Sequence, residues 1–238
     1  MEELGIFCMD RRFNEFIEKN YPHMFVIRNA GANVKPILDE IRNAVQENSI
    51  RKITVFTHTD CGAMGKVFSV IKNNGNAEEE LKETLINQFK SIEFSTKEEL
   101  ESKNLQIQLN VLTEEFPELK VEGKLLDAKK MEGIKNEKEH YLFIVKPGEP
   151  NYSAAFKTEN LDPFQCYVVQ SQVEASMPDI SLAVNDLHAD NIRLVINKAD
   201  NPRESKLYEE LLKLKFASAG KAVNIKAADI RGKERSSI

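Results

Sequence analysis

Short apolar runs alternate with helix-like patterns along the first half of the chain. Residues 4–7, 24–27 and 53–56 are rich in β-branched and aromatic side chains and have the length of buried strands. Residues 34–47 and 63–73 instead place their apolar side chains at the three- and four-residue spacing of a helix. This alternation predicts βαβ units, and therefore an α/β fold with a mainly parallel sheet flanked by helices.

Two charged helices and one more strand are predicted after these units. Residues 78–89 and 97–112 combine dense charge with helical spacing, which is typical of solvated helix faces. Residues 120–127 then have the pattern of a further strand.

Two short polar segments follow predicted strands and carry residue types that bind metals. Cys8, Asp10 and Arg12 come just after the first strand, and His58 and Cys61 come just after the third. The carboxyl ends of parallel strands meet at one edge of a sheet, where ligands bind in such folds. One imidazole and two thiolates at this edge predict a zinc site with an open fourth position.

The expected chemistry of this site is hydration or hydrolysis. Zinc with three protein ligands keeps a water and lowers its pKa toward about 7, which holds hydroxide ready as a nucleophile. Asp10 could accept a hydrogen bond from that hydroxide, and Arg12 could keep Asp10 ionised. Each motif alone also has an ordinary explanation, because a cysteine after an apolar strand is often a small buried hydrophobe. Together the two motifs indicate a zinc enzyme.

Three motifs in this order resemble the β-class carbonic anhydrases. They are C-x-D-x-R at residues 8–12, R-N-A-G at residues 28–31 and H-x-x-C-G at residues 58–62. A weaker match at residues 120–127 is similar to the family's last core strand. The resemblance implies reversible hydration of carbon dioxide to bicarbonate by zinc-bound hydroxide. The implied site residues are the metal ligands Cys8, His58 and Cys61 and the catalytic pair Asp10 and Arg12.

The chain departs from that family in ways that leave the substrate open. Only seven residues precede Cys8, where family members have a helical arm that clasps a second subunit, and the sequence has no tryptophan. Relatives with this metal set hydrolyse carbon disulfide or carbonyl sulfide instead. A zinc-binding protein without turnover is a third alternative. Asp10 and Arg12 speak against it, since a structural zinc needs neither and normally has a fourth protein ligand.

The polar segment 133–139 is the best candidate for a domain boundary, and it separates expected domains at residues 1–133 and 139–238. The second domain repeats the pattern of the first, because residues 166–206 show the same order of apolar runs and turns as residues 24–66. Few residues are identical, and such patterns also arise whenever two α/β units follow each other. We interpret the second domain as a degenerate α/β repeat.

No candidate ligand survives in this second copy. Alignment of the copies equates Cys8 with Val145, His58 with Lys198, and Cys61 with Asn201. The second copy could replace a missing partner subunit, because a lone first domain would leave a sheet edge open to association. We therefore expect an internal pseudo-dimer, either monomeric or in a homo-oligomer, whose second half contributes walls to the zinc pocket.

Backbone groups near the predicted site are further pocket candidates. Asn29 and Gly31 lie in a glycine-containing turn at the carboxyl end of the second strand, and Gly62 directly follows Cys61. The turn could direct amides toward the site, or it could be only a tight strand-to-helix connection. Both interpretations stay open.

Composition and charge narrow the partners and the compartment. The net charge of -5, with acidic and basic residues interspersed, provides no basic stripe for nucleic acid. No apolar run approaches the roughly 20 residues that span a bilayer, and the acidic start lacks the basic region of a signal peptide. Two cysteines committed to metal and a third, Cys166, favour a reducing compartment. We expect a cytoplasmic enzyme that acts on carbon dioxide or bicarbonate, without nucleic-acid or membrane partners.

Overall fold

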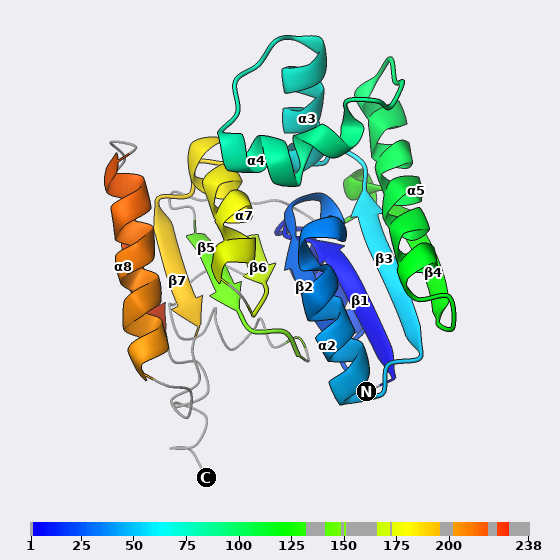
Figure 1. Cartoon of the computed structure of the whole chain (residues 1–238), viewed down its shortest axis with the longest axis horizontal. Coiled ribbons are helices and arrows are strands. Elements are labelled where there is room, and N and C mark those ends of the chain that lie inside the picture. The colour runs from blue at the N-terminus through cyan, green and yellow to red at the C-terminus, as the bar shows by residue number, and fades with distance from the viewer. Residues whose placement is uncertain are drawn as a thin grey trace.

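The computed structural model describes residues 2–131, 141–148, 150, 166–171, 173–195, 202–218 and 223–228. These residues form one sheet with helices around it (Figure 1). Its strands are β1 (Glu3–Cys8), β2 (Phe25–Asn29), β3 (Lys52–His58), β4 (Lys120–Leu126), β5 (Tyr141–Val145), β6 (Cys166–Val169), β7 (Asn191–Val195) and β8 (Asn224–Ala228). The α-helices are α1 (Phe13–Asn20), α2 (Leu38–Asn48), α3 (Gly62–Lys72), α4 (Glu79–Thr84), α5 (Lys97–Glu115), α7 (Val173–Asn185) and α8 (Pro202–Ser218). Short 3-10 turns are η1 (Ala30–Ala32), η2 (Lys35–Ile37), η3 (Ile86–Phe89) and η4 (Ala128–Lys130).

The order of the strands is mirrored about the centre of the sheet. It reads β4-β3-β1-β2-β6-β5-β7-β8, so the second half follows the order of the first from the opposite edge. Neighbouring strands within each half are parallel. The halves meet where β2 and β6 pair antiparallel, at Arg28 and Val169. The predicted α/β fold with a mainly parallel sheet is confirmed.

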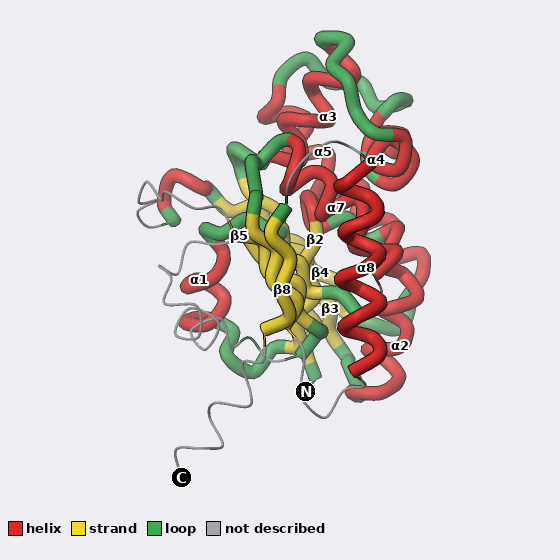
Figure 2. The backbone as a smooth tube through the Cα atoms, turned by 90° about the vertical axis from the view of Figure 1, so that its left-hand side faces the viewer, coloured by secondary structure: helices red, strands yellow, loops and turns green. Residues whose placement is uncertain are grey.

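Helices cover both faces of this sheet. Seen edge-on, α1 lies on one side of the strands, and α2 and α8 lie on the other (Figure 2). Successive side chains of a strand point to opposite faces. Accordingly, Phe7 belongs to the core cluster that contains Phe13 of α1, whereas Ile6 belongs to the cluster that contains Ile41 of α2. No helix in the described ranges is long and apolar enough to cross a membrane.

One hydrophobic cluster extends through both halves. In the first half the rings of Phe7 and Phe56 stack with centroids 4.1 Å apart, and in the second half those of Phe143 and Tyr167 stack at 5.0 Å. All four rings belong to the same cluster, together with Leu182 of α7. Separation of the halves would expose apolar surface, at a cost of roughly 25 cal/mol per Å².

Backbone hydrogen bonds cross between the halves near the antiparallel pair. The amide of Tyr167 in β6 donates to the carbonyl of Met9, which follows β1, over 3.1 Å. The amide of Val26 in β2 donates to the carbonyl of Gly148, which follows β5, over 2.9 Å. The loop after the first strand of each half therefore crosses to the second strand of the other half.

Most predicted elements agree with the structure apart from their ends, but the helix predicted at residues 78–89 is divided into α4 and the 3-10 turn η3. The first and third strands continue to Cys8 and His58, beyond the apolar runs that predicted them. The helix predicted at residues 34–47 begins as a 3-10 turn and becomes α-helical only at Leu38. The interruption lies at Ile37, whose φ of -113° and ψ of 14° depart from the helical values. The expected domain boundary at residues 133–139 lies outside the described residues.

The register of the sheet corrects one part of the alignment between the halves. Gly5 pairs with Val26, and Ile144 pairs with Val168. Since the alignment of β2 with β6 sets Val26 opposite Val168, Gly5 corresponds to Ile144. The first strand of the second half is thus displaced by two residues from its aligned position.

This displacement changes the residue that corresponds to Cys8, the first predicted metal ligand. Pro147, and not Val145, takes the place of Cys8. A shift of two residues keeps the same side chains on the same face of the sheet, so hydrophobic periodicity alone cannot detect it.

Candidate metal centre

The three predicted zinc ligands meet at the carboxyl edge of the sheet. Cys8 and His58 are the last residues of β1 and β3, which are parallel neighbours, and Cys61 immediately precedes α3. All three side chains are buried, and their ligand atoms lie within 4.8 Å of one another. The sheet therefore brings together one imidazole and two thiols from segments about fifty residues apart in the chain.

The spacing of the sulfur atoms fits a tetrahedral zinc ion. The Sγ atoms of Cys8 and Cys61 are 3.9 Å apart. Two thiolates at the usual zinc–sulfur distance of about 2.3 Å and at the tetrahedral angle would be separated by about 3.8 Å. Little movement would be needed to place zinc between them.

Hydrogen bonding prepares one nitrogen of His58 for a metal. Its Nδ1 lies 2.9 Å from the backbone oxygen of Thr59, which can only accept, so Nδ1 carries the proton and donates. Its Nε2 is buried and has no hydrogen-bond partner in the described part of the chain. A buried polar atom without a partner is costly, and a metal ion would satisfy this one. The three residues fit zinc.

The two thiols are poised to ionise in sequence. The thiols of Cys8 and Cys61 share a hydrogen bond, which lowers the pKa of the Cys8 thiol well below its usual range. The same bond raises the pKa of the Cys61 thiol. Negative charge therefore gathers first at Cys8, and a divalent cation would balance it.

Arg12 forms a bidentate ion pair with Asp10 beside the candidate metal ligands. Its Nε donates to Oδ1 over 2.9 Å, and its Nη2 donates to Oδ2 over 2.7 Å. Burial alone would raise the pKa of Asp10, but the hydrogen bonds from Arg12 and the nearby charge of His58 lower it below its usual value. Oδ2 of Asp10 lies 3.9 Å from Nε2 of His58. Asp10 is thus an ionised carboxylate at the edge of the site.

Comparison with known proteins agrees with this geometry. The family model described as "Carbonic anhydrase" matches residues 4–140, which is more than half of the chain and includes all three ligands. The chain belongs to the β-carbonic anhydrase family. Among curated proteins, none matches the chain.

Two solved structures of carbonic anhydrases are similar to the chain. The carbonic anhydrase from Glaciozyma antarctica is 18% identical, with 55% of this chain and 78% of that chain covered and a TM-score of 0.36. The β-carbonic anhydrase CafA of Aspergillus fumigatus is 24% identical, with 55% and 73% covered and a TM-score of 0.39.

Arg28, in the second motif of the β-carbonic anhydrase pattern, braces the loop that carries the ion pair. Its guanidinium is buried and donates to the backbone oxygens of Cys8 over 3.1 Å and Asp10 over 2.8 Å. It also donates to Oδ1 of Asn14 over 2.7 Å. The loop is thereby fixed to β2, a role that its motif in the sequence does not reveal.

Two acidic residues support the segment after β3, and neither stands out in the sequence. Glu101 of α5 is buried and accepts a hydrogen bond from the backbone amide of Cys61 over 2.8 Å. Asp60 accepts from Arg12 through its side chain over 3.2 Å and through its backbone oxygen over 2.8 Å, and it pairs with Lys97 at 3.2 Å. These partners are distant in sequence and have no shared periodicity, so no local pattern marks them.

The predicted pocket residues fall into two groups. Gly62 lines the cavity beside the ligands, whereas Asn29 and Gly31 do not. The side chain of Asn29 instead bonds the backbone of Asn33, accepting from its amide over 2.7 Å and donating to its oxygen over 2.6 Å. Gly31 has a φ of 73°, and a Cβ there would lie 3.0 Å from Met64. In the described structure this turn serves to connect β2 to the helix after it.

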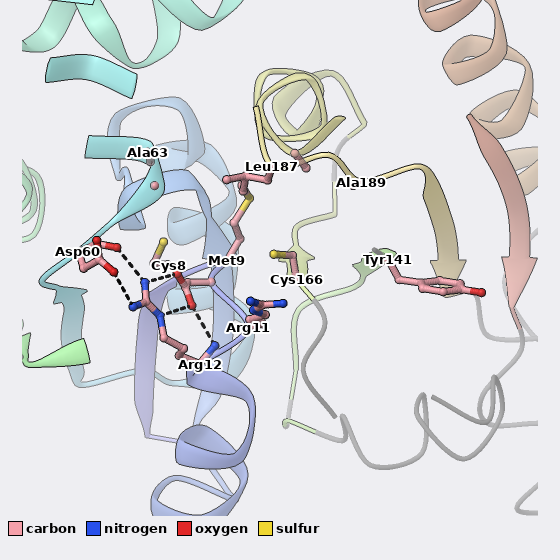
Figure 3. Close-up of a pocket in the computed structure, with 13 residues that line it drawn as sticks. Cys8, Met9, Arg11, Arg12, Asp60, Ala63, Tyr141, Cys166, Leu187 and Ala189 are labelled. Atoms are coloured by element: carbon pink, nitrogen blue, oxygen red, sulfur yellow. Dashed lines mark hydrogen bonds and ion pairs between the residues drawn. The ribbon is translucent and has the colours of Figure 1, made fainter. Parts of the chain in front are cut away.

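A cavity of about 320 Å³ opens beside the metal ligands, between the two halves (Figure 3). The second half supplies five of its walls: Tyr141, Cys166, Ala183, Leu187 and Ala189. Leu187 closely covers the start of α3, because a Cβ on Gly62 would lie 3.2 Å from it. The second half therefore closes one side of the site, as expected from the sequence.

Proposed function

We propose that the protein is a zinc-dependent carbonic anhydrase, which catalyses the reversible hydration of carbon dioxide to bicarbonate. The observation that carries the proposal is the buried group of Cys8, His58 and Cys61, whose spacing fits zinc, beside an ionised carboxylate. A structural zinc site would be closed by a fourth protein ligand. Here a cavity reaches Cys8 instead, which leaves room for a substrate.

The roles of the surrounding residues follow from their contacts. Zinc would be held by the two sulfurs and by Nε2 of His58, and when bound it supplies the Lewis acidity that makes a water molecule nucleophilic near neutral pH. In this proposal Asp10 would accept a hydrogen bond from that water and orient it toward the substrate. Arg12 fixes both carboxylate oxygens and keeps Asp10 ionised.

The cavity suits a small substrate without net charge. Met9 and Ala63 line it from the first half, and Ala183, Leu187 and Ala189 line it from the second. Carbon dioxide is compact and apolar overall, so these walls can hold it while they limit the entry of water. The second half supplies mainly apolar walls of the cavity, and the first half supplies its charged lining residues.

We further propose that residues 1–133 and 139–238 form an internal pseudo-dimer with one active and one inactive site. The mirrored strand order and the antiparallel join support an approximate two-fold arrangement. The hydrogen bonds that cross between the halves are nearly reciprocal. At the end of β5, Lys146 and Pro147 offer no counterpart to the cysteine ligand.

Stopped-flow measurement of carbon dioxide hydration by the zinc-loaded protein tests the proposal. We expect hydration well above the uncatalysed rate, and no sulfide release when carbon disulfide is supplied in a parallel assay. A protein that carries stoichiometric zinc but does not accelerate hydration would overturn the proposal. Sulfide release without hydration would assign the site to hydrolysis of carbon disulfide.

A further inference from the structure

We propose that Arg11 is an anion-binding residue of the metal cavity, and that its ligand is a small planar oxyanion such as bicarbonate. Arg11 occupies the variable position of the C-x-D-x-R motif, between the two residues of the ion pair. The identity of the anion as bicarbonate rests on the proposed function. The presence of an anion site rests on the geometry and charge of the cavity itself.

Arg11 stands at the junction of two cavities. It lines the cavity beside the metal ligands and also a neighbouring one of about 360 Å³, and Arg12 is shared between them in the same way. Its side chain is only half-buried. Figure 3 shows that it points toward Cys166, away from Asp60 and the pair formed by Arg12. A ligand that enters from either cavity would meet its guanidinium.

The other cations around the site are already engaged. Arg12 donates to Asp10 and Asp60, and Lys97 pairs with Asp60. Within the described ranges, the Arg11 side chain has no hydrogen bond or ion pair. Its donors therefore face the cavity and the solvent without an acceptor among the described residues.

Cys166, toward which Arg11 points, does not neutralise it. Burial raises the pKa of the Cys166 thiol to about 12, with a further rise from the charge of Asp10. The charge and the backbone amide of Arg11 oppose that rise without overcoming it. The sulfur is a neutral thiol near pH 7, so it offers Arg11 no opposite charge.

The cations near the cavity differ in their carboxylate partners. Arg12 pairs with Asp10, and Lys97 lies 3.2 Å from Asp60 and 3.8 Å from Glu101. Arg11 pairs with no carboxylate among the described residues, so its charge is available to a small anion that enters the cavity.

The guanidinium of Arg11 would bind bicarbonate more strongly than carbon dioxide. Its planar fork matches two oxygens of a planar oxyanion, and such charge-assisted bonds are the stronger ones. Carbon dioxide has no net charge and gains little from the same group. We therefore expect Arg11 to strengthen binding of bicarbonate and to leave the KM for carbon dioxide nearly unchanged.

Equilibrium titration of the zinc-loaded protein with nitrate, a planar anion that does not react, tests the inference directly. Binding can be followed by NMR shifts, and bicarbonate is titrated beside it. Arg11→Gln should weaken nitrate binding about 3- to 10-fold, in line with a partly exposed charge-assisted contact. Arg11→Lys should recover part of the loss, because it keeps the charge without the fork. Lys19→Gln, which removes a cation from the neighbouring cavity only, is the matched control and should bind as the wild type does.

Kinetics provide a second readout for the same variants. Arg11→Gln should raise the KM for bicarbonate by a similar factor, with the zinc content and the KM for carbon dioxide unchanged. Nitrate binding that depends on Arg11 in a protein without hydration activity would sustain the anion site and overturn only the proposed function. An active, zinc-replete Arg11→Gln variant that binds nitrate with wild-type affinity would overturn the anion site alone.

Discussion

The two halves of the molecule share one sheet architecture and differ at the ends of their strands. In the first half β1 leads into Cys8, Asp10 and Arg12, whereas in the second half β5 leads into Lys146 and Pro147. The order of the strands and their parallel pairing are the same in both. The difference teaches that this sheet only positions side chains, and that the chemistry depends on a few residues where its strands end.

The second half contributes contacts and walls in place of ligands. Asp179 of α7 is buried and accepts from the amide of Ala30 over 2.8 Å and from Gln170 over 2.6 Å. Lys66 of α3 pairs with Asp186, just after α7, at 2.6 Å. These contacts hold α7 against the elements that carry the metal ligands. One half thus supplies the candidate ligands, and the other covers them.

Removal of the second half is the largest perturbation of this comparison. A chain that ends at Ile134 would lack the antiparallel partner of β2, the second-half walls of the cavity and much of the shared core. We expect it to aggregate or to be inactive, because it exposes a sheet edge and apolar surface. Size-exclusion chromatography and carbon dioxide hydration would show this. A soluble, fully active monomer would mean that the second half is an independent appendage.

Replacement of one cysteine in each half sharpens the contrast between them. Cys61→Ala should bring zinc well below one ion per chain and reduce hydration to background, because it removes one of three ligands. Cys166→Ala is the matched control, since this second-half cysteine lines the same cavity but lies outside the ligand group. It should keep its zinc. Elemental analysis decides, and stoichiometric zinc in Cys61→Ala would contradict the ligand assignment.

Asp10 and Asp60 both pair with Arg12, but their substitution should affect the hydration rate to different extents. Asp10→Asn should retain zinc and lose about 10- to 100-fold in hydration rate, as is usual for residues that orient a metal ligand. Asp60→Asn is the control, because its side chain is 70% exposed and an exposed ion pair contributes little. It should lose less than about 5-fold. Equal rates in zinc-replete Asp10→Asn and wild type would remove Asp10 from the mechanism.

The contact between the halves at Asp179 should make stability depend on pH. Burial raises the pKa of this carboxyl from 3.8 to about 7, although the amide of Ala30 and the side chain of Gln170 lower it in part. Between these values the folded protein holds a proton that the unfolded chain has released. The stabilisation is therefore greatest near pH 4 and is lost as the pH rises to about 7, by on the order of 4 kcal/mol at most.

Asp179→Asn tests this dependence, because asparagine does not titrate. The difference in unfolding free energy between the wild type and the variant should change between pH 5 and pH 8, with the wild type losing more stability as the pH rises. Urea denaturation at the two pH values measures it. Parallel changes in both proteins would show that Asp179 does not titrate in this range.

The strands and the grouping of Cys8, His58 and Cys61 could be predicted from the sequence because their signals are local. Cys8 and His58 directly follow apolar runs, and a parallel sheet must bring the ends of such strands together. The ion pair of Asp10 with Arg12 spans only two residues, so it too was within reach of a short motif.

The support of the site could not be predicted, because it joins residues that are far apart. Glu101 reaches the amide of Cys61 across 40 positions, and Asp179 reaches Ala30 across 149. Neither contact is marked by a periodic pattern in the sequence. The displacement of β5 by two residues also escaped detection, since a strand repeats every two residues.

The position of zinc is the most direct test of the difference between the halves. Elemental analysis of the zinc-loaded full chain, combined with anomalous diffraction at the zinc edge, would count and locate the metal. We predict one zinc per chain, bound between Cys8, His58 and Cys61, and none in the second half. A chain without zinc at this site, or with zinc bound by the second half, would contradict the account.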